Sequence, residues 1–116
     1  MTEDRNLLIG RVRAALADAG HPAPLEKPMF GCRAFMVDDK LVVAVRANTD
    51  LLVRIDPDRC DELLGVAGAK PAEMGTGRTM GPGWLDVAAG ALDDPALDFW
   101  VGVALEFNPR ARKSGR

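Results

Sequence analysis

The chain has 116 residues with 17 acidic and 15 basic side chains, a net charge of −2 and 47% apolar residues. That apolar content supports one folded domain and excludes wholesale disorder. No apolar run approaches the roughly 18 residues that a membrane span needs, and the start of the chain is acidic where a secretory signal is basic. We therefore expect a cytoplasmic protein with no membrane partner.

The first predicted element is an amphipathic helix that ends at Gly20. Glu3 and Asp4 suit the positive end of its dipole, and the prolines at 22 and 24 prevent it from continuing. An extended connector, residues 21–25, follows. Apolar side chains recur at three- and four-residue steps, the spacing of one helix face, at Leu8, Val12, Ala15, Leu16 and Ala19.

Three strands are predicted next, as a meander over residues 29–37, 41–47 and 51–56, because the apolar period changes to two. We expect a two-residue turn at 39–40 and a three-residue turn at 48–50, which align Arg33, Arg46 and Arg54 across the strands. The apolar face is predicted to hold Phe30, Cys32, Ala34, Met36, Leu41, Val43, Val45, Leu51, Val53 and Ile55. The other, mixed face is predicted to hold Arg33, Phe35, Val37, Val42, Ala44, Arg46, Leu52, Arg54 and Asp56.

Two aspartate–proline pairs predict helix starts in the second half of the chain. Asp56-Pro57 begins a short helix that Gly65 closes, and Asp94-Pro95 begins a longer one with Trp100 on its inner side. Between these two helices, residues 81–87 predict a short edge strand.

The fold class predicted from these elements is α+β. It consists of an antiparallel sheet, a three-stranded meander plus one or two short strands, with helices before, within and after it. We expect a single domain over residues 1–108. The tail, residues 109–116, is basic and is expected to be disordered.

Several segments in this order resemble the N-terminal domain of the TfoX/Sxy family of competence regulators. They are Lys27-Pro-Met-Phe-Gly-Cys, the strand ending in Val37-Asp38-Asp39-Lys40, the Leu51-to-Asp56 strand entering a helix, Gly77-Arg78-Thr79-Met80, and the helix with Asp94-Pro95, Trp100 and Ala104-Leu105. The resemblance implies the same α+β fold with no known catalytic residues. Two-domain members of this family act as transcriptional co-regulators of DNA uptake with the cyclic-AMP receptor protein. A role in transcription regulation and a transcription factor as partner are therefore implied.

The aligned arginines are the main candidate binding residues. Like charges on neighbouring strands cost up to about 1 kcal/mol unless an anion offsets them. That anion is either an internal carboxylate or an external phosphate or acidic segment. The internal candidates are Asp56, Asp98 and Glu106.

No catalytic or metal constellation emerges from the sequence. Cys32 and Cys60 have no metal-ligand spacing. Cys32 with His21 is a poor nucleophile and base, because an apolar face raises the pKa of a thiol. We therefore expect no enzyme activity, no metal and no cofactor.

Two functions remain open at this point. The first is a protein-interaction module that binds an unknown protein partner through Arg33, Arg46, Arg54, Phe35 and Trp84; a homodimer is also compatible with the sequence. The alternative is direct nucleic-acid binding by the arginine-bearing face, assisted by the tail residues Arg110, Arg112, Lys113 and Arg116. The tail holds four basic side chains and no acidic one, so residues 1–108 have a charge of −6. An acidic body argues against general affinity for nucleic acid.

Overall fold

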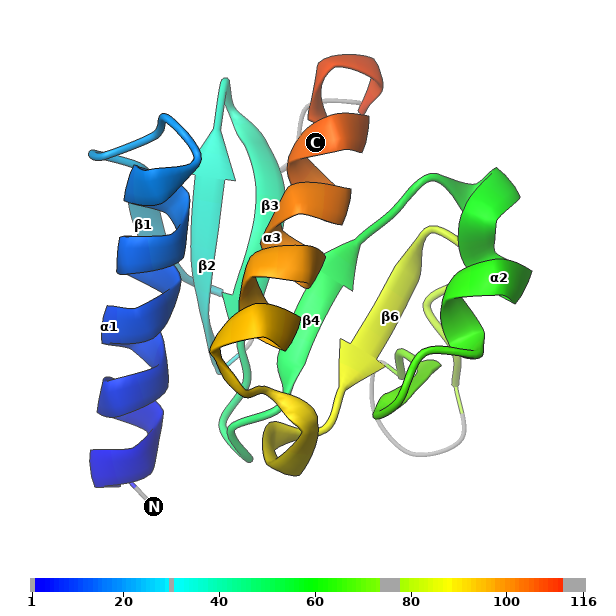
Figure 1. Ribbon diagram of the computed structural model, residues 1–116, viewed down its shortest axis with the longest axis horizontal. Helices are drawn as coiled ribbons and strands as arrows, with labels where there is room; N and C mark the ends of the chain where they lie inside the picture. Colours follow the sequence, from blue (N-terminus) through cyan, green and yellow to red (C-terminus); the bar gives the residue numbers. More distant parts are fainter. Residues whose placement is uncertain (1, 30, 74–77, 112–116) are drawn as a thin grey trace.

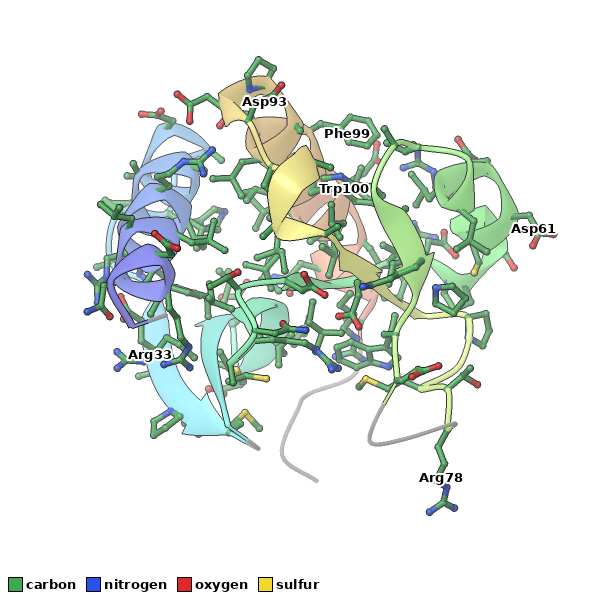
Figure 2. The ribbon with its side chains drawn as sticks, turned by 90° about the horizontal axis from the view of Figure 1, so that it is seen from below. Arg33, Asp61, Arg78, Asp93, Phe99 and Trp100 are labelled. Atoms are coloured by element: carbon green, nitrogen blue, oxygen red, sulfur yellow. The ribbon has the colours of Figure 1, made fainter. Side chains whose placement is uncertain are left out.

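In the computed structural model, which describes residues 2–29, 31–73 and 78–111, six antiparallel strands form one sheet. Two helices, α1 (Thr2–Asp18) and α3 (Asp94–Phe107), lie side by side on one face of it (Figure 1). Seen from below, both helices lie above the sheet (Figure 2). The order across the sheet is β1 (Leu25–Met29), β2 (Cys32–Val37), β3 (Lys40–Val45), β4 (Leu51–Arg54), β6 (Trp84–Val87) and β5 (Ala69–Pro71). The predicted α+β class and antiparallel sheet are confirmed.

The chain leaves the meander through a crossover. After β4 it forms the 3₁₀ turn η1 (Pro57–Arg59) and the helix α2 (Cys60–Leu64), which contacts β5 and β6. It then enters β5 at the sheet edge and returns as β6, between β4 and β5. Two further 3₁₀ turns, η2 (Ala89–Ala91) and η3 (Asn108–Arg110), flank α3. Among the described helices, none has the length and apolarity needed to cross a membrane.

Helix ends follow the predicted capping chemistry closely. Gly20 has a positive φ of 99°, and its N–H bonds to the Ala17 carbonyl while the His21 N–H bonds to Leu16, so α1 ends there. Asp56 accepts a hydrogen bond from the Asp58 N–H, as expected of a cap. At α3 the prediction was wrong by one residue, because Asp93 is the cap and accepts from the Ala96 N–H.

Neither predicted hairpin register was right. Leu51 of β4 pairs with Val45, whereas a turn at residues 48–50 would pair it with Ala47. The register between β2 and β3 was wrong as well. The hairpin turn is Asp38-Asp39, both with positive φ (55° and 65°), so Val37 pairs with Lys40. This turn displaces the β2–β3 pairing by two residues from the prediction, an even change that by itself keeps every side chain on its predicted face. An odd change of register exchanges the two faces of a strand relative to its neighbour.

A β-bulge then adds a one-residue change of register, which exchanges the faces of β2 relative to β3 and places Arg33 opposite Val45, not opposite Arg46. Phe35 pairs with Val43 and Met36 with Leu41, which leaves Val42 as the extra residue. Val42 and Val43 therefore both belong to the core under the helices. The sequence carries no glycine or proline signal at this position.

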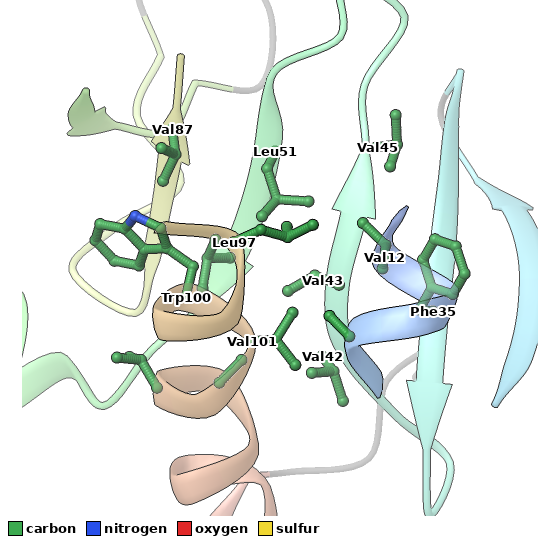
Figure 3. Packing of buried hydrophobic residues seen from close by; sticks show 14 of the residues in the cluster. Val12, Phe35, Val42, Val43, Val45, Leu51, Val87, Leu97, Trp100 and Val101 are labelled. Atoms are coloured by element: carbon green, nitrogen blue, oxygen red, sulfur yellow. The ribbon is translucent and has the colours of Figure 1, made fainter. Parts of the chain in front are cut away.

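The main core lies between the helices and the sheet (Figure 3). It includes Phe35 and Val37 of β2, which were predicted for the mixed face, together with Val43, Val45, Leu51, Val53 and Ile55, which were predicted correctly as one apolar set. Trp100 is fully buried, as predicted.

A second, smaller cluster lies on the opposite face of the sheet. It consists of Ala34, Met36, Leu41, Ala44, Leu52 and Ala72, packed with Met29, Cys32, Met80 and Trp84. The predicted apolar face therefore mixed residues of both clusters, with β2 inverted. Phe30, which was predicted for that face, lies outside the described residues.

Three strand predictions also need correction. β1 was not predicted as a strand of its own: Leu25 was assigned to the connector and Met29 to the first strand of the meander. Its sequence has Pro28, two charged residues and no apolar alternation, as protected edge strands do. β5 has only three residues, Ala69–Pro71, and was not predicted. β6 was expected at an edge but is an interior strand.

Gly68 is the position where the fold most clearly requires glycine. Its φ is +85°, and a methyl group there would overlap the Cβ of Ala91. We expect Gly68→Ala to lower the free energy of unfolding by about 1–3 kcal/mol through backbone strain and overlap, measured by urea denaturation.

Two controls test the cause of that loss. Gly90→Ala, where a Cβ meets nothing within 4 Å, should change stability by no more than about 0.5 kcal/mol. Adding Ala91→Gly to Gly68→Ala should restore part of the loss. A double variant no more stable than Gly68→Ala would contradict the steric account.

Candidate functional site

A polar cleft of about 580 Å³ lies between the β3–β4 turn, β5 and β6. It is on the sheet face opposite the helices, because Asp86 pairs in register with Leu52 of the second cluster. Its volume is within the usual range of small-molecule sites. The lining residues are Arg46, Asn48, Asp50, Lys70, Pro71, Glu73, Thr79 and Asp86.

Arg46 and Asp86 form the buried centre of this cleft. The Arg46 Nε lies 3.0 Å from the Asp86 Oδ1, a close ion pair without hydrogen-bond geometry, and Asp86 is only 5% exposed. Both terminal nitrogens of Arg46 donate to the carbonyl oxygen of Glu73, each at 3.0 Å. One of them also reaches the sulfur of Met80 at 3.5 Å. Arg46 thereby joins the end of β3 to β6 and to the segment after β5.

Asp50 makes a second set of connections beside the first. Its Oδ2 lies 3.1 Å from the Nζ of Lys70 and accepts from the Asn48 side-chain amide at 3.3 Å. Its Oδ1 accepts from the backbone N–H of Ala89 at 3.3 Å. The turn that presents Asp50 is set by the Asn48 side chain, which accepts from the Asp50 N–H, and by a positive φ of 71° at Thr49.

The charges in the cleft influence the protonation of its buried groups. Burial raises the pKa of Asp86, and the Arg46 charge opposes that rise, while the nearby Asp50 adds to it. Cys32 does not line the cleft, but burial also raises the pKa of its thiol, and the charges of Arg46 and Arg5 oppose that rise. A thiol with a raised pKa is a weak nucleophile.

Arg33 lies on the other face of the sheet. Its Nη1 is 3.2 Å from the Glu26 Oε1, and Glu26 also binds Arg13 of α1, with an Nε–Oε2 distance of 2.6 Å. Figure 2 places Arg33 below α1, at the β1–β2 end of the sheet. The pKa of Glu26 is lowered, mainly by the hydrogen bond from Arg13.

Arg54 lies at the opposite end of β4 from the cleft. It is directly paired with Trp84 of β6, and its guanidinium lies 5.2 Å from the centre of the Trp84 ring. Both side chains are half-buried. Burial lowers the pKa of Arg54. This pair shares a sheet face with Arg46, which Arg33 does not.

The structure therefore does not bring the three predicted arginines together. Phe35, the fourth predicted residue, is fully buried and cannot touch a partner. Of the expected counter-ions, Asp56 pairs with Arg110 at 3.0 Å and Glu106 with Arg59 at 2.8 Å.

Only the first residues of the predicted basic tail lie within the described part of the chain. Arg110 pairs with Asp56 and stacks over the ring of Phe107, whereas Arg112, Lys113 and Arg116 lie outside the described residues. Within the described ranges, no group of three or more His, Cys, Asp or Glu side chains is placed to hold a metal ion.

Sequence reasoning missed Asp50, Lys70 and Asp86. The one available signal was Asp86 itself, a lone acid within the apolar stretch from Trp84 to Val87. A buried acid needs a cationic partner, and this need could have indicated Arg46.

We expect Arg46→Met to raise the pKa of Asp86 further, because the charge that opposes the burial effect is lost. The measurement is a pH titration of the Asp86 carboxyl carbon by NMR. Since the folded pKa exceeds the unfolded one, the contribution of Asp86 to stability falls as pH rises through the interval between them, and this interval widens in the variant. Lys70→Met should raise the pKa less, and an unchanged or lower Asp86 pKa in Arg46→Met would contradict the arrangement.

Most of the chain matches a known protein family. The model of the TfoX N-terminal domain matches residues 16–108, well over half of the chain. No curated protein and no solved structure matches it significantly. The matched range contains the whole sheet, α2 and α3, and so includes both the cleft and the Arg54–Trp84 pair. The chain belongs to the TfoX N-terminal domain family.

Proposed function

We propose that this chain is a non-enzymatic protein-interaction module that binds a partner protein through the sheet face opposite the helices. The contact surface comprises the polar cleft around Arg46 and the neighbouring Arg54–Trp84 pair. The observation that carries the proposal is the pairing of opposite charges inside the cleft, where Asp86 and Asp50 accompany Arg46 and Lys70.

Paired charges favour a protein partner over a polyanion. A nucleic-acid backbone would approach two carboxylates together with the two cations, and like charges brought together cost several kcal/mol. A protein segment offers donors, acceptors and charges of both signs, which suit such a surface. The separation of Arg33 from Arg46 and Arg54 argues further against an arginine platform for nucleic acid.

Trp84 and Arg54 supply the chemistry of an interface anchor. Tryptophan and arginine are among the residues most enriched where binding energy concentrates. The ring gives apolar contact area, and the guanidinium stacks over it at 5.2 Å from its centre. Both side chains are half-buried, so ordering them on binding costs little conformational entropy.

Family membership is the support for placing this interaction in transcription regulation. The TfoX N-terminal domain is not a known enzyme family. Because two-domain members of the family act as transcriptional co-regulators, a transcription factor is the class of partner to test first.

Trp84→Ser should remove the partner contact, because it removes the apolar anchor. The test is affinity purification from cells that produce the protein, at low and at high salt, with the retained proteins identified by mass spectrometry. Wild type should retain a defined protein at high salt, and Trp84→Ser should lose it. Leu7→Ser, which removes a 64% exposed leucine on the helical side, is the matched control and should retain it.

A DNA-binding assay tests the alternative function directly. Labelled duplex and single-stranded DNA are titrated with the wild-type chain while fluorescence anisotropy is recorded. Specific binding of DNA that Arg54→Glu abolishes, with no protein retained at high salt, would replace the protein-interaction proposal by direct nucleic-acid binding. Circular dichroism of each variant establishes that it is folded.

A further inference from the structure

Negative charge is concentrated on the segments that form η1, α2 and α3. Residues 56–64 and 93–107 hold eight of the 17 acidic side chains and one of the 15 basic ones. These segments therefore carry −7, and the rest of the chain carries +5. The single base, Arg59, bridges Glu62 and Glu106, so it links α2 to α3 across this surface. The net charge of −2 thus conceals a strongly one-sided distribution.

Part of this acidity is not neutralised within the protein. Asp56 and Asp94 have arginine partners, Arg110 and Arg11. Asp58, Asp61 and Asp98 are exposed and form no ion pair with the described residues.

An aromatic ring is exposed on the same surface. Phe99 of α3 is 43% exposed, one of three large exposed apolar side chains among the described residues. Figure 2 shows it projecting from α3 on the side toward α2, with Asp61 beyond. Its ring packs edge to face against that of buried Trp100, with centroids 5.2 Å apart. An exposed aromatic ring that also packs on a buried one offers apolar contact area to a partner.

Gly102 lies one helical turn after Phe99, on the same exposed side of α3. Glycine within a helix costs about 1 kcal/mol relative to alanine. A Cβ at Gly102 would meet nothing within 4 Å, so no packing inside the protein requires the missing side chain. The helix backbone is open there to close approach from outside.

We propose that the exposed face of α3, centred on Phe99 and Gly102 and bordered by the acids of η1, α2 and α3, docks a lysine- or arginine-rich segment of a partner protein. An apolar residue of that segment packs on Phe99 and over Gly102. Its basic residues meet Asp58, Asp61 and Asp98, which steer association and set its orientation. α1 has a similar pair, exposed Leu7 and open Gly10, but its flanking charges are of both signs and specify no partner.

This surface lies on the helical side of the sheet, opposite the cleft and Trp84. This proposal depends on the proposed function in one respect, that the protein binds a partner protein. Different residues carry the two surfaces, so each is tested by its own variants.

The test uses a synthetic amphipathic peptide of leucine and lysine, labelled for fluorescence anisotropy. Gly102→Leu should weaken its binding about tenfold or more by filling the open position, while thermal stability is retained or raised because leucine is the better helix former. Phe99→Ser should weaken binding similarly. Asp61→Asn with Asp98→Asn should reduce the salt dependence of the dissociation constant.

Gly10→Leu on α1 is the matched control and should leave peptide binding unchanged, as should Trp84→Ser. Equal binding by wild type and Gly102→Leu would overturn the proposal. So would equal weakening by Gly10→Leu, or equal affinity for a leucine–glutamate peptide. Self-association of the wild type in sedimentation velocity that Gly102→Leu abolishes would assign the face to a second copy of the chain and overturn the basic partner.

Discussion

The ion pair between Arg46 and Asp86 holds together the sheet face opposite the helices. Asp86 is an interior-strand residue whose neighbours Leu85 and Val87 point into the main core, so its own side chain is directed to the other face. There it is 5% exposed, and a carboxylate so buried is tolerable only with a cation beside it. Arg46 is that cation, and through the Glu73 carbonyl it also fixes the segment after β5. The cleft, and the placement of Ala72 and Met80 over the second cluster, follow from this arrangement.

The three arginines of the sheet each contact another side chain of the protein. Arg33 is held by Glu26 under α1, Arg46 by Asp86, and Arg54 stacks on Trp84. Basic groups used in this way build mixed, structured surfaces suited to a protein contact. The acidic excess lies elsewhere, around α2 and α3, where Phe99 is exposed. The two sides of the sheet therefore present different chemistry, and one of the two proposed contacts lies on each side.

The sequence was sufficient for features that depend on local chemistry. Capping by Asp56, the glycine stop after α1 and the burial of Trp100 all follow from the residue and its near neighbours. The β2–β3 register was not accessible in this way, because Asp38-Asp39 adopts two positive φ values without a glycine. The bulge at Val42 has no sequence marker either. This unmarked bulge exchanged the faces of β2 relative to β3, which moved Phe35 from the predicted surface to the core and separated Arg33 from Arg46. The cleft could not be predicted because it forms only when the crossover after β4 brings β5 and β6 next to Arg46.

The most direct test of this account is the coupling free energy between Arg46 and Asp86. Free energies of unfolding are measured by urea denaturation for wild type, Arg46→Met, Asp86→Leu and the double variant. We predict that Arg46→Met alone costs about 3–5 kcal/mol, because it leaves a buried carboxylate unpaired. The free energy of unfolding of the double variant should then exceed the value expected from adding the two single effects by at least about 1.5 kcal/mol. Effects that add within about 0.5 kcal/mol would contradict the central role given to this ion pair.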